Sequence, residues 1–314
     1  MRLETVDAVT RSLNSTAVET GVAGLRVGVV VATLGRPAES ADLLRHLRTQ
    51  SLAPSATVMS VESAKDLPAS LPDGVEVVTG PRGLCAQRNR GIEKIRNRCD
   101  VIAFFDDDYL PAKTALAGIA TLFARHPDVV GATGLVLADG VGRGGVSLAE
   151  AEALVASPPP PPEEGAWIER DIVTAYGCNM AFRVSAMAEI SFDERLPLYG
   201  WQEDVDFAGQ ISRYGRVVET RAFCGVHRGV STGRTPGARL GFSQIVNPIY
   251  LARKGTMRWS HALRIISSNL IANHVRSLKP EPHVDRMGRM RGNWIGLLHI
   301  ASGRLDPQYM LQLK

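Results

Sequence analysis

The 314-residue sequence has few cysteines, few aromatic residues and no long apolar run. Its four cysteines form no C-x-x-C pair, so their spacing suggests neither a disulfide framework nor a zinc site. No apolar run approaches the roughly 18 to 20 residues that a membrane-spanning helix needs, and residues 1–25 lack the apolar core of a signal peptide. We therefore expect reduced thiols and a location on the cytoplasmic side.

What the sequence does contain is an uneven distribution of charge. The 45% hydrophobic content is typical of a globular protein with a substantial core. The net charge is +4, but residues 211–314 hold 17 Lys and Arg against 4 Asp and Glu, a net of +13, whereas the first 210 residues carry −9. Such asymmetry points to an anionic partner such as a phosphate, a nucleic acid or a lipid headgroup.

Apolar segments alternate with helical patterns over the first 140 residues. Strands are expected at 25–33, 57–61, 75–79, 100–105 and 129–137, and helices at 41–50, 84–97 and 111–126. This alternation predicts βαβ units and a mostly parallel sheet flanked by helices, hence an α/β fold. Ligands of such sheets bind at the carboxyl ends of the strands.

The remaining sequence is less regular. Residues 139–165 are rich in Gly, Ala and Ser and include five prolines, Pro158–Pro162, which predicts a loop that is either a surface insertion or a mobile lid. Regular patterns return from Trp167 to about Gly229, and Trp259–Leu278 has helical apolar spacing.

Three adjacent acids follow the apolar strand at 100–105. Asp106, Asp107 and Asp108 repel one another unless a cation lies among them. One interpretation is a solvated acidic turn. The other is a Mg²⁺ or Mn²⁺ site shared with a substrate diphosphate, because carboxylate oxygens suit these ions and the strand ends where ligands bind.

Several short motifs occur in an order that resembles the family 2 glycosyltransferases of the GT-A fold. The resemblance covers Arg26–Arg228, about two thirds of the chain. Its segments are VVATLGRP, GLCAQRNRG, FFDDDYLP, GCNMAFR followed by FDERL, the pair Glu203–Asp204, and His227. Each motif is weak alone, whereas the ordered combination is specific.

The resemblance implies a set of donor-binding residues. Ala32, Thr33 and Arg36 would contact the nucleotide, and Glu62 would receive the base or ribose, with Asp66 as a competitor. Arg88, followed by Asn89, would lie near the diphosphate. In the acidic triplet, Asp106 would face the ribose with Asp107 beside it, while Asp108 and His227 would bind Mg²⁺ or Mn²⁺.

The resemblance also implies an acceptor side. Asp204 would be the general base that takes the proton of the acceptor hydroxyl, with Glu203 in support or contacting the acceptor. Asn179 would line the acceptor side, and Trp201 is either a stacking platform for a sugar ring or a core residue. Because Glu203, Asp204 and Asp206 fall within one helical turn, they cannot all point into one cleft.

The predicted organisation has three parts. These are an N-terminal extension at 1–24, a GT-A catalytic domain at 25–230, and a basic helical region at 231–314. The catalytic domain divides into a donor-binding half at 25–137, the proline-rich loop at 139–165, and an acceptor half at 166–230. The basic region either caps the catalytic domain or lies on an anionic membrane as a peripheral element.

The resulting hypothesis is an inverting, metal-dependent transfer of sugar from a nucleotide diphosphate, preferably UDP. The acceptor would be a hydroxyl of a saccharide or lipid-linked saccharide in bacterial polysaccharide or glycoconjugate biosynthesis. A retaining transferase or a nucleotidyltransferase is the alternative, and the anomeric configuration of the product separates the transferases. We expect no nucleic-acid partner, because the basic residues are not interleaved with aromatic ones and the body is acidic.

Overall fold

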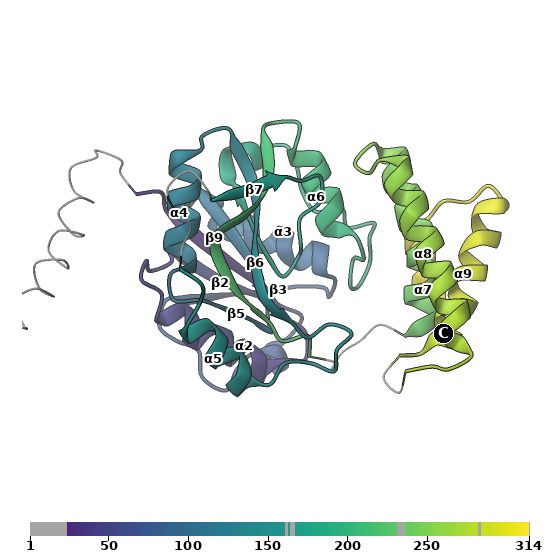
Figure 1. Cartoon of the computed structure of the whole chain (residues 1–314), viewed down its shortest axis with the longest axis horizontal. Helices are drawn as coiled ribbons and strands as arrows, with labels where there is room; N and C mark the ends of the chain where they lie inside the picture. The colour runs from purple at the N-terminus through teal and green to yellow at the C-terminus, as the bar shows by residue number, and fades with distance from the viewer. Residues whose placement is uncertain (1–23, 161–162, 164–166, 231–235, 282–283, 314) are drawn as a thin grey trace, which may run out of the picture.

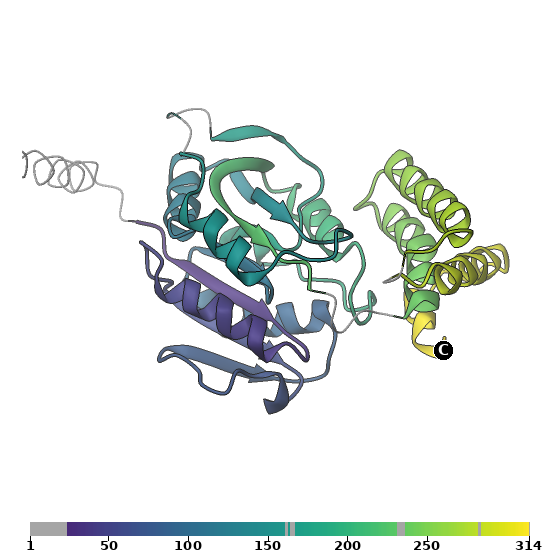
Figure 2. The same cartoon turned by 60° about the horizontal axis from the view of Figure 1, so that its bottom comes forward.

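The computed structural model describes residues 24–160, 163, 167–230, 236–281 and 284–313. A twisted sheet with helices on both sides forms the main body, and three C-terminal helices pack as a bundle beside it (Figures 1 and 2). The predicted N-terminal extension lies outside the described residues, except for Gly24.

The strands form one nine-stranded sheet. Its order is β3-β2-β1-β4-β8-β6-β9-β5, and β7 pairs with β9. The pairs among β1 to β4 are parallel, whereas β8 and β5 run antiparallel to their neighbours. The strands are β1 Val27–Ala32, β2 Ala56–Val61, β3 Val75–Thr79, β4 Val101–Asp106, β5 Tyr109–Pro111, β6 Val129–Asp139, β7 Ile168–Asp171, β8 Asn179–Arg183 and β9 Arg216–His227.

The helices connect these strands and form the C-terminal bundle. They are α2 Pro37–Arg48, α3 Leu84–Ile95, α4 Ala115–Arg125, α5 Leu148–Ala156, α6 Glu203–Ile211, α7 Gly237–Lys254, α8 Trp259–Ser277 and α9 Arg286–Ala301. Short 3₁₀ turns occupy Ala64–Asp66, Arg96–Arg98, Val184–Met187 and Pro307–Gln312.

The central strands are buried on both faces, as their continuous apolar sequences predict. Val29 and Val31 of β1 pack with Leu43 of α2 on one face, and Val30 packs with Ile92 of α3 on the other. β1 and β4 are parallel neighbours in a register that places Ala32 beside Asp106. The acidic triplet therefore begins at the carboxyl edge of the sheet, where a ligand can reach it.

Two expected elements differ from the structure. The helix expected at 111–126 starts only at Ala115, because Tyr109–Pro111 pairs with β9 as strand β5. The loop expected at 139–165 contains helix α5, so that prediction is wrong for Leu148–Ala156. Ser147 caps α5 by accepting a hydrogen bond from the Glu150 N–H, and the buried Ala151 packs in a cluster with the sheet.

The C-terminal helices approach one another closely. A Cβ at Gly241 of α7 would lie 2.1 Å from the Arg289 carbonyl oxygen of α9, and one at Gly292 would lie 2.0 Å from that of Ala238. Glycine is therefore required at both positions for this crossing. Among the described residues, no helix combines the length and apolarity needed to cross a membrane.

The bundle is joined to the catalytic part by a shared core and by buried charges. Leu251 and Met257 belong to the same apolar cluster as Phe207 of α6. Lys254 Nζ lies 2.7 Å from carboxylate oxygens of both Asp193 and Asp206. Asp206 also accepts a hydrogen bond from the Thr256 hydroxyl at 2.6 Å. Helix α7 thus helps to hold the helix that begins at Glu203.

We expect Lys254→Met to lower the free energy of unfolding by about 2 kcal/mol, because it leaves two neighbouring carboxylates without their shared cation. Urea unfolding followed by circular dichroism measures the change. Arg253→Met is the matched control, since Arg253 is exposed. Equal unfolding midpoints for the two variants would contradict the structural role of Lys254.

Candidate functional site

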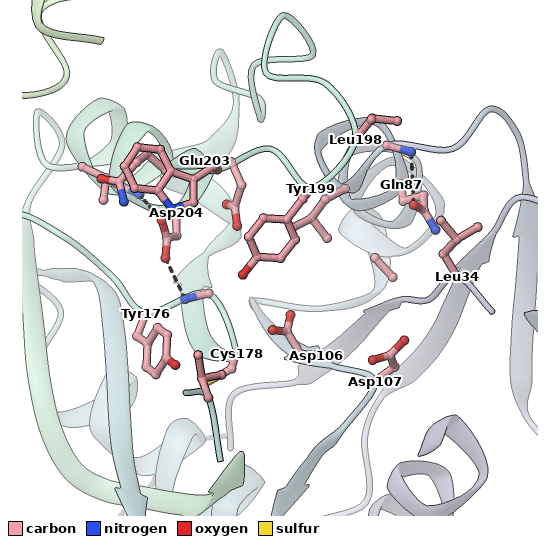
Figure 3. A pocket seen from close by; sticks show the side chains of 18 of the residues that line it. Leu34, Gln87, Asp106, Asp107, Tyr176, Cys178, Leu198, Tyr199, Glu203 and Asp204 are labelled. Atoms are coloured by element: carbon pink, nitrogen blue, oxygen red, sulfur yellow. Dashed lines mark hydrogen bonds between the residues drawn. The ribbon is translucent and has the colours of Figure 1, made fainter. Parts of the chain in front are cut away.

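A cavity of about 620 Å³ opens at the carboxyl ends of β1 and β4. Figure 3 shows Asp106 and Asp107 on one side of it and Glu203 and Asp204 on another, with the Tyr199 ring directed into the space between them. Nine of the residues predicted from the sequence line this cavity: Ala32, Thr33, Arg36, Asp106, Asp107, Trp201, Glu203, Asp204 and His227. Residues as far apart in the chain as Ala32 and His227, 195 positions, thus share one site.

Asp106, Asp108 and His227 form a group with metal-ligand geometry. Ligand atoms of the three side chains all lie within 4.8 Å of one another, and His227 Nε2 is 3.4 Å from Asp108 Oδ1. The buried Asp108 Oδ1 has no hydrogen-bond partner among the described residues. Two carboxylates and an imidazole fit a divalent cation, which would satisfy that oxygen.

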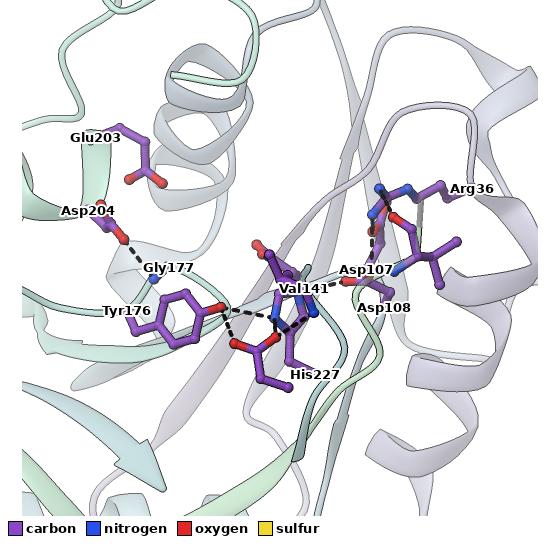
Figure 4. A network of polar contacts seen from close by, with 12 residues as sticks. Arg36, Asp107, Asp108, Val141, Tyr176, Gly177, Glu203, Asp204 and His227 are labelled. Atoms are coloured by element: carbon purple, nitrogen blue, oxygen red, sulfur yellow. Dashed lines mark hydrogen bonds and ion pairs between the residues drawn. The ribbon is translucent and has the colours of Figure 1, made fainter. Parts of the chain in front are cut away.

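The imidazole of His227 is oriented by polar contacts to its Nδ1 atom (Figure 4). Its Nδ1 lies 3.1 Å from Asp139 Oδ1 and 3.2 Å from the Tyr176 hydroxyl, which donates to Asp139 Oδ2. Although burial acts in the opposite direction, the hydrogen bonds from His227 and Tyr176 lower the pKa of Asp139 to about 2. The Asp139 carboxylate therefore favours a proton on Nδ1 and leaves Nε2 for a metal.

Asp107 turns to a different set of partners. It accepts hydrogen bonds from the Thr33 hydroxyl at 2.7 Å and from Arg36 Nη1 at 2.9 Å. Arg36 Nη1 also lies 3.3 Å from Asp108 Oδ2. The arginine after β1 thus offsets part of the negative charge of the triplet and fixes the β1 end of the cavity.

Arg88 lies beneath the cavity rather than in its lining. Its guanidinium is buried and lies 3.0 Å from Asp106, 2.6 Å from Glu203 and 2.9 Å from the Gly177 carbonyl oxygen. The expected place of Arg88 near a diphosphate stays a prediction, and its guanidinium is already paired within the protein. Arg88 joins the acid at the end of β4 to the first residue of α6.

Asp204 is held by backbone groups and not by a cation. Its Oδ2 accepts from the Gly177 N–H at 3.0 Å, and its Oδ1 accepts from the Val205 N–H at 2.8 Å. Among the described residues, no cation lies within ion-pair distance of Asp204. Burial raises the pKa of Asp204 above its ordinary value, because desolvation outweighs these hydrogen bonds.

The backbone before α6 is strained. Leu198 and Gln202 adopt positive φ angles of 56° and 74°, and Gly200 between them has φ 61°. Such angles are uncommon for residues with a Cβ and recur at functional sites. This segment carries Tyr199 and Trp201 to the cavity and presents Glu203 and Asp204 at its end.

Besides Arg88 and Asp108, the predicted residues Glu62 and Asn179 lie outside the cavity lining. Glu62 is exposed, and its competitor Asp66 is buried, where it accepts hydrogen bonds from the backbone N–H groups of Gly35 and Ser63. Asn179 is fully buried in β8, where its amide donates to the Tyr109 hydroxyl. The acceptor-side role expected for Asn179 is therefore corrected, because its side chain is enclosed by the sheet.

Sequence reasoning missed residues that belong to the site. Asp139 ends the long strand β6 and touches His227 only because β6 and β9 are neighbours. Arg239 and His261 line the cavity from α7 and α8. For Arg239 and His261, the sequence offered one signal, the excess of basic residues after position 210. That excess does not identify which individual residues reach the cavity.

The fold agrees with comparisons to known proteins. Residues 55–191 match the family model described as Glycosyl transferase family 2. No curated protein sequence matches the chain. The crystal structure of S. aureus TarS 1–349 is 14% identical with a TM-score of 0.51, covering 89% of this chain and 92% of that one. The structure of TarS 1–349 in complex with UDP-GlcNAc is 13% identical with a TM-score of 0.52, and the match covers 89% of this chain and 93% of that one.

A second protein shares the architecture. The crystal structure of GalNAc-T7 with UDP, GalNAc and Mn²⁺ is 12% identical with a TM-score of 0.52, covering 93% of this chain and 56% of that one. Identities this low show the fold alone. The fold predicted from the sequence, GT-A with a helical C-terminal region, is thereby confirmed.

We expect Asp139→Asn to weaken Mn²⁺ binding by about 10- to 100-fold, because the amide neither polarises His227 nor selects its tautomer as the carboxylate does. Titration with Mn²⁺ followed by electron paramagnetic resonance gives the affinity. Asp171→Asn, an exposed acid on β7, is the control. Unchanged affinity in Asp139→Asn would show that Asp139 does not orient a metal ligand.

Proposed function

Because the chain is a glycosyltransferase with a family 2 domain and the GT-A fold, we propose that it transfers a sugar with inversion from a nucleoside diphosphate to an acceptor hydroxyl. The observation that carries this proposal is that Asp204, Asp106 and His227 line one cavity, while Asp108 lies beside Asp106 and His227 with ligand atoms within 4.8 Å of theirs. A metal beside the leaving diphosphate and a base beside the acceptor are the two groups that such a transfer requires.

The donor is a UDP-sugar in this proposal. Structural neighbours contain UDP-GlcNAc or UDP, and the cavity extends to the β1 end where Ala32, Thr33 and Arg36 lie. Asp106, Asp108 and His227 would hold Mn²⁺ or Mg²⁺, and the charge of that ion would supply the stabilisation that a leaving diphosphate needs. Arg36 lines the cavity near the end of β1, where its guanidinium is paired with Asp107.

Asp204 is the general base. As the acceptor oxygen attacks the anomeric carbon, its proton passes to the Asp204 carboxylate, and the bond from that carbon to the diphosphate oxygen breaks on the opposite face. The backbone N–H groups of Gly177 and Val205 aim the carboxylate. Its raised pKa makes it a stronger base than an exposed aspartate.

The acceptor is a saccharide or a lipid-linked saccharide in polysaccharide or glycoconjugate assembly. Trp201 is half-buried in the cavity lining and offers a ring face to a sugar. Glu203 is paired with Arg88, so it supports Asp204 indirectly. Burial raises the pKa of Glu203 well above its usual range, although Arg88 acts against this.

We expect Asp204→Asn to lower kcat by about 10²- to 10⁴-fold with little change in UDP affinity, since it removes the base and leaves the metal ligands. In the wild type, kcat falls as pH decreases through the pKa of Asp204, and this decline lies at higher pH than for an ordinary aspartate. UDP release gives the rates, with Asp171→Asn as control. Retention of full activity in Asp204→Asn would reject the assignment.

The C-terminal bundle carries a surface suited to an anionic membrane. Ile271 and Val275 of α8 and Leu278 directly after it are exposed, as are Trp294 and Leu298 of α9. The two rows are joined where Trp294 Nε1 donates to His274 Nε2 at 3.0 Å. The exposed cations Lys279 and Arg291 lie on the same two segments. Exposed apolar and basic residues together favour the inner face of the cytoplasmic membrane.

We expect the wild type to float with phosphatidylglycerol vesicles and the double variant Val275→Glu, Leu298→Glu to remain in the bottom fraction. Added carboxylates oppose insertion among acyl chains and anionic headgroups. Tyr214→Glu, which alters an exposed ring in the catalytic part, serves as control. Equal flotation of both proteins, or none for the wild type, would reject membrane binding by this face.

A further inference from the structure

The C-terminal bundle supplies one wall of the cavity. Pro236 and Arg239 at the start of α7, and His261 and Ile265 of α8, line it together with Asp204. Asn247 of α7 donates to the Trp201 carbonyl oxygen at 2.8 Å, which ties the bundle to the segment that precedes Asp204. The bundle wall therefore adjoins the side of the cavity that holds the proposed base.

This wall is rich in donors that have no acidic partner. Arg239 Nε donates to the Leu313 carbonyl oxygen at 2.9 Å, and among the described residues no carboxylate pairs with its guanidinium. Arg264 Nη2 lies 3.2 Å from His261 Nδ1. Because arginine only donates, Nδ1 accepts, and the His261 proton resides on Nε2.

The arginines at the other side of the cavity are different. Arg36 is paired with Asp107 and Asp108, and the buried Arg88 is paired with Asp106 and Glu203. In the proposed function, the diphosphate of the donor is served by the group of Asp106, Asp108 and His227. The donors of the bundle wall thus remain for a second anionic group, which enters from the acceptor side.

We propose that the acceptor carries a phosphate or carboxylate near its accepting hydroxyl, and that Arg239 and His261 bind this group. The proposal rests on the proposed function, because Asp204 defines the acceptor side. The planar guanidinium of Arg239 suits either anion. Arg264 donates to His261 and keeps its Nε2 proton available. Arg239 and His261 are specificity-determining residues in this account and take no part in bond breaking.

The test is a calorimetric titration of the full-length protein saturated with UDP and Mn²⁺, so that the donor side is filled. The probes are glycerol 3-phosphate, glycerate and uncharged glycerol. We expect the wild type to bind at least one anionic probe and to bind glycerol at least tenfold more weakly. Arg239→Ala and His261→Ala should each weaken the anionic probe about tenfold. The exposed Arg253→Ala, outside the cavity lining, should match the wild type.

The titration of UDP with Mn²⁺ is recorded separately for each protein. Failure of the wild type to bind UDP contradicts the proposed function, whereas normal UDP binding with equal probe affinities in Arg239→Ala and Arg253→Ala overturns the present inference alone. A loss of UDP affinity in Arg239→Ala also overturns it, because Arg239 would then serve the donor. Arg239→Lys, which keeps the charge, should recover part of the probe affinity and excludes a folding defect as the cause.

Discussion

The arrangement of the site depends on one buried guanidinium. Arg88 lies 3.0 Å from Asp106 at the end of β4 and 2.6 Å from Glu203 at the start of α6, two residues 97 positions apart in the sequence. A buried carboxylate such as that of Glu203 is stable as an anion only with a cation beside it. Because Glu203 directly precedes Asp204, the same contact relates the metal group to the proposed base. Gly177, whose N–H binds Asp204 and whose carbonyl oxygen binds Arg88, completes the link.

The acidic residues of the first 210 positions and the basic residues after them occupy different positions around Arg88. Acids of the first 210 residues form the proposed metal group and include the proposed base. Several of the later basic residues have distinct positions, because Lys254 neutralises Asp193 and Asp206, Arg239 lines the cavity, and Lys279 and Arg291 lie on the outer helices. The bundle thus forms part of the cavity lining and is also a candidate surface for a membrane.

Much of the fold was predictable, because buried parallel strands have continuous apolar sequences and the acidic triplet directly follows one of them. The order of motifs also identified Asp108, Asp204 and His227 as members of one site. Contacts made by long-range pairing were not predictable, such as those of Asp139 with His227 and of Arg88 with Glu203. Helix α5 was missed because its Ala-rich sequence resembles the loop around it, and burial of Ala151 stabilises it. Glu62 and Asn179 were assigned by motif position, which does not report the direction of a side chain.

The most direct test of a metal-dependent transferase is the release of UDP from a panel of UDP-sugars, measured with saccharide and saccharide-phosphate acceptors. The account predicts release from at least one sugar donor in the presence of Mn²⁺, loss of that release in EDTA, and recovery when Mn²⁺ is restored. Release that continues undiminished in EDTA would contradict the role given to Asp106, Asp108 and His227.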